Sequence, residues 1–139
     1  SSQNRILGVQ LYKYQVHGFL HWGFNFYNSQ FSRRPINPFA VTDADMGFPS
    51  GDAFMVYPGE DGKPWSSIRL EVFYEGLCDL RALALLEELT SREEVLNTIQ
   101  GGLAEELTVF QYPKDAAYLL KLRSRINDAI ACKTNGKEA

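Results

Sequence analysis

The sequence lacks several features that would place it at once in a class of protein. Its 139 residues include only two cysteines, too few for a scaffold held together by disulfides. No apolar run approaches the roughly 20 residues that a membrane-spanning helix requires. Positive charge is sparse, because the longest basic run is Arg33-Arg34, the net charge is −3 and the isoelectric point is about 5.4. We therefore expect neither a nucleic-acid partner nor a membrane partner.

The remaining composition is that of an ordinary globular chain. Hydrophobic residues make up 45% and charged residues 22% of the sequence, enough to bury a core. Cys78 and Cys132 lie far apart in helical patterns, so we expect buried or half-buried thiols that leave the cellular compartment unknown. The sequence opens at Ser1 with neither a Met nor a basic leader, which favours a processed, truncated or engineered N-terminus and hence a fragment.

Two apolar runs have the length and composition of buried strands. Residues 18–25 (GFLHWGFN) and 51–59 (GDAFMVYPG) are rich in aromatic and aliphatic residues and are bounded by turn formers. They predict strands over residues 19–26 and 53–57, the first apolar on both faces as in a parallel sheet. Buried strands need hydrogen-bonded neighbours on both sides, and the sequence supplies too few. We therefore expect residues 1–139 to form a single incomplete unit.

Helical periodicity accounts for most of the other residues. An apolar stripe predicts a helix over residues 4–16, stopped by His17-Gly18. Either Ser66 or Ser67 is expected to cap a helix that reaches Leu89. Residues 90–139 then predict C-terminal helices, one opened by a capping box of Ser91 with Glu94 and one opened by Pro113 and Asp115. The order of helix, strand, loop, strand and helix predicts an α/β fold with appended helices.

Three patterns resemble metal or phosphate sites, but each lacks a residue or a length that such a site requires. His17 and His21 have the spacing of two zinc ligands on a helix, but Gly18 lies between them and no third ligand is evident. The run 43–47 (DADMG) begins like a calcium loop, yet Phe54 occupies the twelfth position, where a bidentate Glu is required. The run 59–63 (GEDGK) is too short for a phosphate-binding loop and is expected to be a surface turn. We expect no metal and no cofactor.

Aromatic side chains are concentrated around the predicted strand ends and the long loop of residues 27–50. A loop of this length is usually functional or disordered. Trp22, Tyr57 and Trp65 each combine a flat ring with a polar group and lie near Asn25, Asp52 or a turn. Flat aromatic faces beside amides and carboxylates suit a sugar ring, whose C–H groups pack on the aromatic ring while its hydroxyls form hydrogen bonds. Single aromatics such as Phe24, Phe26 and Phe31 are as readily explained as core residues.

Several motifs in this order give the sequence a family resemblance. The stretch from about Val16 to Leu89 resembles the C-terminal part of proteins similar to glycoside hydrolase family 123. The motifs that carry the resemblance are residues 18–25, Gly51-Asp52, Tyr57-Pro58-Gly59, residues 67–71 (SIRLE) and residues 75–79 (EGLCD).

This resemblance implies a (β/α)₈ barrel and action on N-acetyl-β-galactosaminides. The family's mechanism is substrate-assisted: the acetamido oxygen attacks the anomeric carbon, an Asp orients it, and the neighbouring Glu is the acid. The sequence contains no adjacent Asp-Glu pair, which the resemblance assigns to an upstream strand. We therefore expect the C-terminal fragment of such a barrel, comprising its last two strands and their helices, with no catalytic residue and no activity of its own.

Barrel active sites form at the C-terminal ends of the strands. On this basis the resemblance implies sugar contacts from Trp22, Asn25 and Tyr57, to which Asp52 and Trp65 are added as substrate-binding candidates. The charged residues Arg69, Glu71 and Asp79 are expected to be structural, tying the closing helix to the barrel wall. The alternative hypothesis is a non-catalytic carbohydrate-binding or self-associating structural domain. The expected partners are a carbohydrate and either a second copy of the chain or the missing barrel portion.

Overall fold

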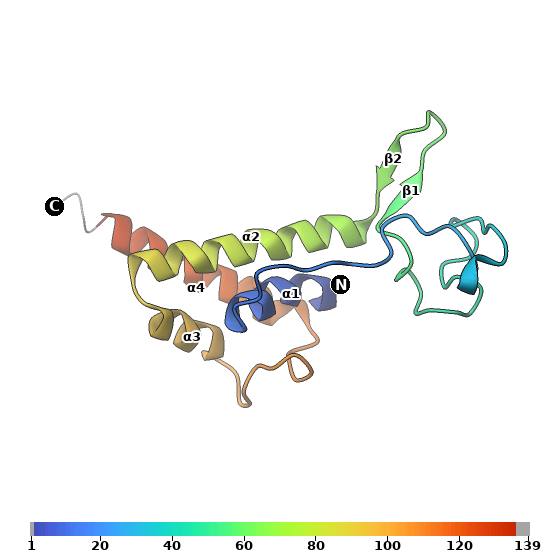
Figure 1. Cartoon of the computed structure of the whole chain (residues 1–139). Helices are drawn as coiled ribbons and strands as arrows, with labels where there is room; N and C mark the ends of the chain where they lie inside the picture. Colours follow the sequence, from blue (N-terminus) through green and yellow to red (C-terminus); the bar gives the residue numbers. More distant parts are fainter. Residues whose placement is uncertain (1, 136–139) are drawn as a thin grey trace. The chain divides into compact units, whose positions relative to one another are not determined.

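The computed structural model describes residues 2–135, which divide into two compact units. The helical unit comprises residues 2–17 and 72–135, and the loop unit comprises Gly18–Glu71. Helices α1 (Ser2–Lys13), α3 (Arg92–Gln100) and α4 (Ala116–Asn135) belong to the helical unit. The long helix α2 (Ile68–Leu89) begins in the last residues of the loop unit and continues through the helical unit (Figure 1). No helix of the described residues is both long enough and apolar enough to cross a membrane.

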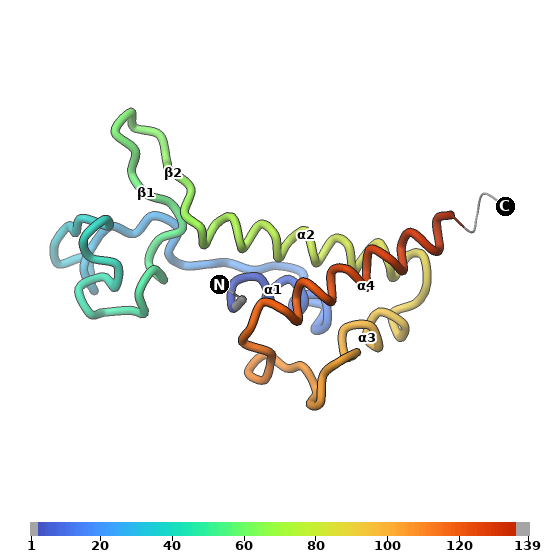
Figure 2. Tube along the Cα trace, turned by 180° about the vertical axis from the view of Figure 1, so that it is seen from behind, coloured from blue at the N-terminus to red at the C-terminus, as the bar shows by residue number. Residues whose placement is uncertain are grey.

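The helical unit is built around one apolar core. Helix α4 packs against both α1 and α3 (Figure 2), and α1 lies so close to α2 that a Cβ added to Gly8 would sit 1.8 Å from the carbonyl oxygen of Gly76. On α2, Leu83 is fully buried whereas Leu77 and Leu80 are half-buried. The buried residues of the core are Ile6, Val9, Tyr12, Leu83, Leu86, Val95, Ile99, Leu107, Tyr118, Leu119, Leu122 and Ile126.

The helix starts follow the capping residues that the sequence predicts. Between the two candidates for α2, Ser67 is the cap, since its hydroxyl accepts a hydrogen bond from the Leu70 N–H at 3.3 Å. Ser91 accepts from the Glu94 N–H at 3.2 Å and so caps α3. At the start of α4, Asp115 accepts from the N–H groups of Ala117 and Tyr118. Each side chain satisfies backbone donors that the first helical turn leaves without a partner.

Helix α1 ends earlier than its apolar stripe predicts. Its last helical residue is Lys13, and Gln15 adopts the left-handed conformation with φ of 52°. The N–H of Gln15 donates to the Tyr12 carbonyl and the N–H of Val16 donates to the Leu11 carbonyl, which is the hydrogen-bond pattern of a Schellman motif. Glycine usually occupies the left-handed position of this motif, so Gln15 at this position gives no sequence signal that the helix ends.

The expected parallel strands are wrong. The structure has one small antiparallel sheet of β1 (Val56–Pro58) and β2 (Pro64–Ser66), in which Tyr57 pairs with Trp65. Only the end of the predicted strand 53–57 enters β1, and the turn at residues 59–63 closes the hairpin. Residues 19–26 are irregular except for a bridge between Asn25 and Phe54. Phe19, Leu20, Trp22 and Phe24 are 48–91% exposed, so this run is not the buried strand that its composition favours.

The loop unit has a small core and a long ordered loop. Ala44, Ala53 and Phe54 are fully buried, and the rings of Phe26, Tyr27, Phe48 and Tyr57 pack around them. A short 3₁₀ helix, η1 (Gln30–Ser32), lies within the loop of residues 27–50. Ala44, Asp45 and Met46 all have positive φ angles of 53–64°, a left-handed turn that is unusual for residues with a side chain. The helices and the two-stranded sheet together are compatible with the expected α/β class.

Candidate functional site

A cluster of polar contacts around Asp52 joins residues 21–23 of the loop unit to residues 52 and 53. The indole Nε1–H of Trp22 donates to Oδ2 of Asp52 at 3.0 Å. Nε2 of His21 lies 3.6 Å from Oδ1 of the same carboxylate, and Nδ1 of His21 accepts from the Gly23 N–H at 3.2 Å. A Cβ on Gly23 would lie 2.8 Å from the backbone of residues 52 and 53, so the close approach of the two segments requires glycine here. Asp52 is therefore held between two consecutive aromatic side chains.

The indole of Trp22 packs against two other aromatic rings yet remains half-exposed to solvent. Its ring centroid lies 4.5 Å from that of Phe48 and 5.5 Å from that of Phe26, the latter in an edge-to-face arrangement. Trp22 nevertheless keeps 49% of its surface exposed. A Trp fixed by two rings and one hydrogen bond loses little conformational entropy when it binds a ligand. The arrangement can therefore present a rigid aromatic face beside a carboxylate.

A second aromatic group surrounds the hairpin. Phe39 stacks on Tyr57 with 5.1 Å between ring centroids and meets the ring of Trp65 at 6.2 Å. Tyr57 also contacts Phe54 edge to face at 5.2 Å. The antiparallel register explains why Tyr57 and Trp65 lie together, because they are paired residues of β1 and β2. Phe39 comes from the long loop, so sequence spacing alone does not reveal its place in this group.

The candidate sugar-contact residues thus fall into two groups and one outlier. Trp22 lies with Asp52, and Tyr57 lies with Trp65. Asn25 is exposed, and its backbone bridges to Phe54. Both groups border the same small core, since the neighbours of Trp22 and the ring of Tyr57 pack around Phe54. Convergence of Trp22, Asn25 and Tyr57 on one concavity stays a prediction.

The residues expected to be structural have different surroundings. Arg69 donates to the Phe54 carbonyl through Nη2 at 3.0 Å and Nε at 3.3 Å, and its guanidinium lies 5.3 Å from the Phe54 ring centroid. It therefore ties the first turn of α2 to the core of the loop unit. Glu71 is exposed in the same turn.

Asp79 forms the centre of a buried ion-pair cluster in the helical unit. It is 2% exposed, and its carboxylate accepts from Arg5 at 2.7 and 3.1 Å and from Arg123 at 2.9 Å. The hydrogen bond to Asp79 raises the pKa of the Arg5 guanidinium above its usual value. Sequence reasoning identified Asp79 but neither arginine, because residues on α1 and α4 lie far from it along the chain.

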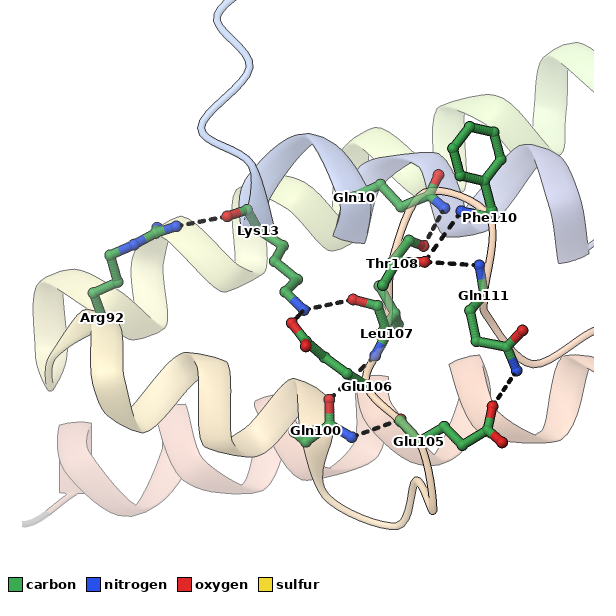
Figure 3. Close-up of polar contacts among 10 residues, drawn as sticks. All are labelled: Gln10, Lys13, Arg92, Gln100, Glu105, Glu106, Leu107, Thr108, Phe110 and Gln111. Atoms are coloured by element: carbon green, nitrogen blue, oxygen red, sulfur yellow. Dashed lines mark hydrogen bonds and ion pairs between the residues drawn. The ribbon is translucent and has the colours of Figure 1, made fainter.

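The connection between α3 and α4 forms a second ordered feature, shown in Figure 3. Gln100 donates to the Glu105 carbonyl and accepts from the Leu107 N–H, while Gln10 donates to the carbonyls of Thr108 and Val109. Lys13 binds the Glu106 carboxylate and thereby lowers the pKa of that side chain. The same connection contains a concavity of about 340 Å³, lined by Leu103, Ala104, Glu105, Glu106, Leu107, Gln111, Tyr112 and Pro113.

His21 is the site residue that sequence reasoning missed. Its pairing with His17 suggested only a metal site, and the described residues contain no group of three or more His, Cys, Asp or Glu side chains that could hold a metal ion. The contact of His21 Nδ1 with an N–H two residues later is a local turn feature. The sequence signal for this site is Gly23, because a glycine in an apolar run indicates that another backbone segment lies close to it.

The family of the chain follows from a comparison with protein-family models. Residues 1–86 match the model described as glycoside hydrolase 123, catalytic domain. The chain belongs to glycoside hydrolase family 123. In this family-123 chain the match takes in α1, the whole loop unit and most of α2. The matched region includes both aromatic groups and Asp79. The function of the chain is therefore related to that of glycoside hydrolases. Helices α3 and α4 lie beyond the match, and no curated protein matches the chain.

Proposed function

We propose that the loop unit supplies part of the sugar-binding surface of a family-123 glycoside hydrolase, with Trp22 as the principal contact. The observation that carries the proposal is the half-exposed indole held by Asp52 and packed against Phe48. Sugar rings pack their apolar C–H face on such an aromatic plane, while neighbouring polar groups fix their hydroxyls. Tyr57, Trp65 and Asn25 are the further contacts in this proposal.

For the substrate class we propose an N-acetyl-β-galactosaminide, which the family resemblance implies. An N-acetyl-β-galactosaminide carries an apolar acetamido methyl group as well as ring C–H groups, and both suit aromatic side chains. In the proposal these residues belong to the closing part of a (β/α)₈ barrel. The Asp-Glu pair of the substrate-assisted mechanism comes from residues outside this sequence, so the chain alone binds the sugar weakly and hydrolyses nothing.

A titration of the labelled chain with methyl N-acetyl-β-galactosaminide tests this proposal. Amide and indole resonances around Trp22 are expected to shift, and Trp22→Ala is expected to weaken binding about tenfold, which corresponds to roughly 1.4 kcal/mol. Phe110→Ala is the matched control, because Phe110 is an 89% exposed aromatic of the helical unit. Equal shifts in the wild-type chain and Trp22→Ala, or no shifts at all, would exclude Trp22 as the contact.

The exposed apolar side chains of the loop unit support a second candidate function, that of a self-associating structural module. Leu20 and Met46 are 91% and 90% exposed, and Phe31 is 76% exposed. Exposed apolar side chains that lie together on a surface can form an interface. We propose a second copy of the chain as its occupant in isolation. Sedimentation of a monomer at micromolar concentration, unchanged by Leu20→Ser, would exclude self-association.

A further inference from the structure

The imidazole of His21 has a fixed pattern of hydrogen-bond donor and acceptor. Nδ1 accepts a hydrogen bond from the Gly23 N–H at 3.2 Å. A ring nitrogen that accepts from a backbone N–H carries no proton, so the proton of the neutral ring is on Nε2. Nε2 is the atom that faces Oδ1 of Asp52 at 3.6 Å. The backbone of residue 23 therefore selects the tautomer that presents a donor to the carboxylate.

Asp52 therefore has a hydrogen bond at one oxygen and a longer polar contact, beyond hydrogen-bond distance, at the other. Oδ2 accepts from the Trp22 indole at 3.0 Å, and Oδ1 faces His21. The side chain of Asp52 is 40% exposed and that of His21 is 28% exposed, so water competes with both contacts. A carboxylate held at one oxygen alone can rotate about its last side-chain bond. Contact at the second oxygen limits this rotation and with it the direction of the Trp22 indole.

We propose that His21 is a positioning residue, which orients the Trp22 indole through Asp52. Asp52 links the two side chains in this arrangement, and the face of the indole is offered to the sugar. The inference rests on the proposed function, because the oriented indole is the surface offered to the sugar. Neither the family match nor the spacing of the two histidines assigns this role to His21.

Two substitutions at position 21 separate the roles of the two ring nitrogens. His21→Asn keeps an acceptor near the position of Nδ1 for the Gly23 N–H but has no group that reaches Asp52. His21→Gln places an amide N–H near the position of Nε2 and keeps a donor for Asp52. The wild-type chain is the parent, because Trp65 is itself a proposed sugar contact. The sequence contains only two tryptophans, so the indole signal that remains in Trp65→Phe is assigned to Trp22, and that variant is used for this assignment alone.

The first readout is the Nε1–H resonance of Trp22 and its exchange with solvent. In His21→Asn we expect this resonance to shift toward the value of an unbonded indole and its exchange to accelerate about two- to tenfold, as expected for weakening a single hydrogen bond. His21→Gln is expected to remain close to the parent, and Asp52→Asn is expected to reproduce the change seen in His21→Asn. An unchanged indole resonance in His21→Asn, or equal changes in the Asn and Gln variants at position 21, overturns the proposal, whatever Asp52→Asn does.

Titration with methyl N-acetyl-β-galactosaminide distinguishes this inference from the proposed function. If the indole resonance responds as expected and affinity falls in His21→Asn but not in His21→Gln, both stand. If the indole responds while no variant and no parent binds the glycoside, the positioning role stands and the proposed function fails. If the parent binds and the two variants at position 21 bind equally, the positioning role of His21 is overturned while the proposed function remains.

Discussion

The two units of this chain obtain their order in different ways. Among the described residues, twelve buried side chains form the core of the helical unit, whereas three form that of the loop unit. Both units expose some apolar side chains, such as Phe110 and Leu20, but the helical unit buries its central charge, Asp79, whereas the loop unit leaves Trp22 and its partner Asp52 partly exposed. Regular helices bury one face each and so form a closed core. Irregular segments bury fewer side chains and leave others available for contact, which is where the proposed sugar surface lies.

The largest effect expected from this comparison is the loss of a side chain from the helical core. Leu83 is fully buried, so Leu83→Ala is expected to reduce the free energy of unfolding by about 2–5 kcal/mol through lost burial and the cavity that remains. Leu85→Ala is the control, since Leu85 lies two residues further on the same helix and is 44% exposed. Denaturant unfolding monitored by helical circular dichroism measures both. Similar midpoints for the two variants would contradict the assigned core.

The next effect in size is expected at alkaline pH, which should lower the stability of the helical unit. The Tyr118 hydroxyl donates to the Ile99 carbonyl, and burial raises the pKa of Tyr118 to about 12. The unfolded phenol ionises near pH 10. Stability from this group is therefore complete below pH 10 and is lost as the pH rises through about 12. Tyr118→Phe removes the ionisable group and is expected to flatten this part of the stability profile. A variant profile identical to that of the wild type would contradict the prediction.

A smaller effect is expected at the start of α2. Arg69→Met keeps an apolar chain against the rings of Phe54 and Tyr57 but removes the donors to the Phe54 carbonyl. Loss of hydrogen bonds from a charged donor is expected to cost about 1–2 kcal/mol. Hydrogen exchange should accelerate at the amide of Met55, which is bonded to the Phe24 carbonyl, and remain unchanged in α4. Faster exchange in α4 as well would show that the two units do not open separately.

The smallest expected effect is a stabilisation. Met46 is 90% exposed and has a φ of 62°, a conformation that costs a side-chain-bearing residue about 1 kcal/mol and costs glycine little. Met46→Gly is expected to stabilise the loop unit by up to about 1 kcal/mol, reduced by the greater freedom of glycine in the unfolded chain. Slower exchange of the Gly47 and Phe48 amides, both bonded to the Asp43 carbonyl, measures this. Faster exchange would indicate that Met46 makes a stabilising contact.

Sequence reasoning performed well in the helical unit because periodicity and capping are local properties. Ser91 and Asp115 mark the starts of α3 and α4 as expected, whereas the end of α1 at Gln15 and the arginine partners of Asp79 are not predicted. It failed for residues 19–26 because an apolar run reveals its hydrophobicity but not its hydrogen-bond partners. The same limitation applies to the candidate site. Trp22 and Asp52 were identified separately, but their bond joins residues 30 positions apart.

The cluster at Asp79 also bears on the order in which the chain folds. Its three side chains come from α1, α2 and α4, with 74 residues separating Arg5 from Asp79 and 44 separating Asp79 from Arg123. If α2 became buried with only one arginine present, a second contact to the carboxylate would be missing, so partly assembled states are disfavoured. The helical unit is therefore expected to assemble cooperatively, at a rate limited by closing two long loops, although each helix alone forms quickly.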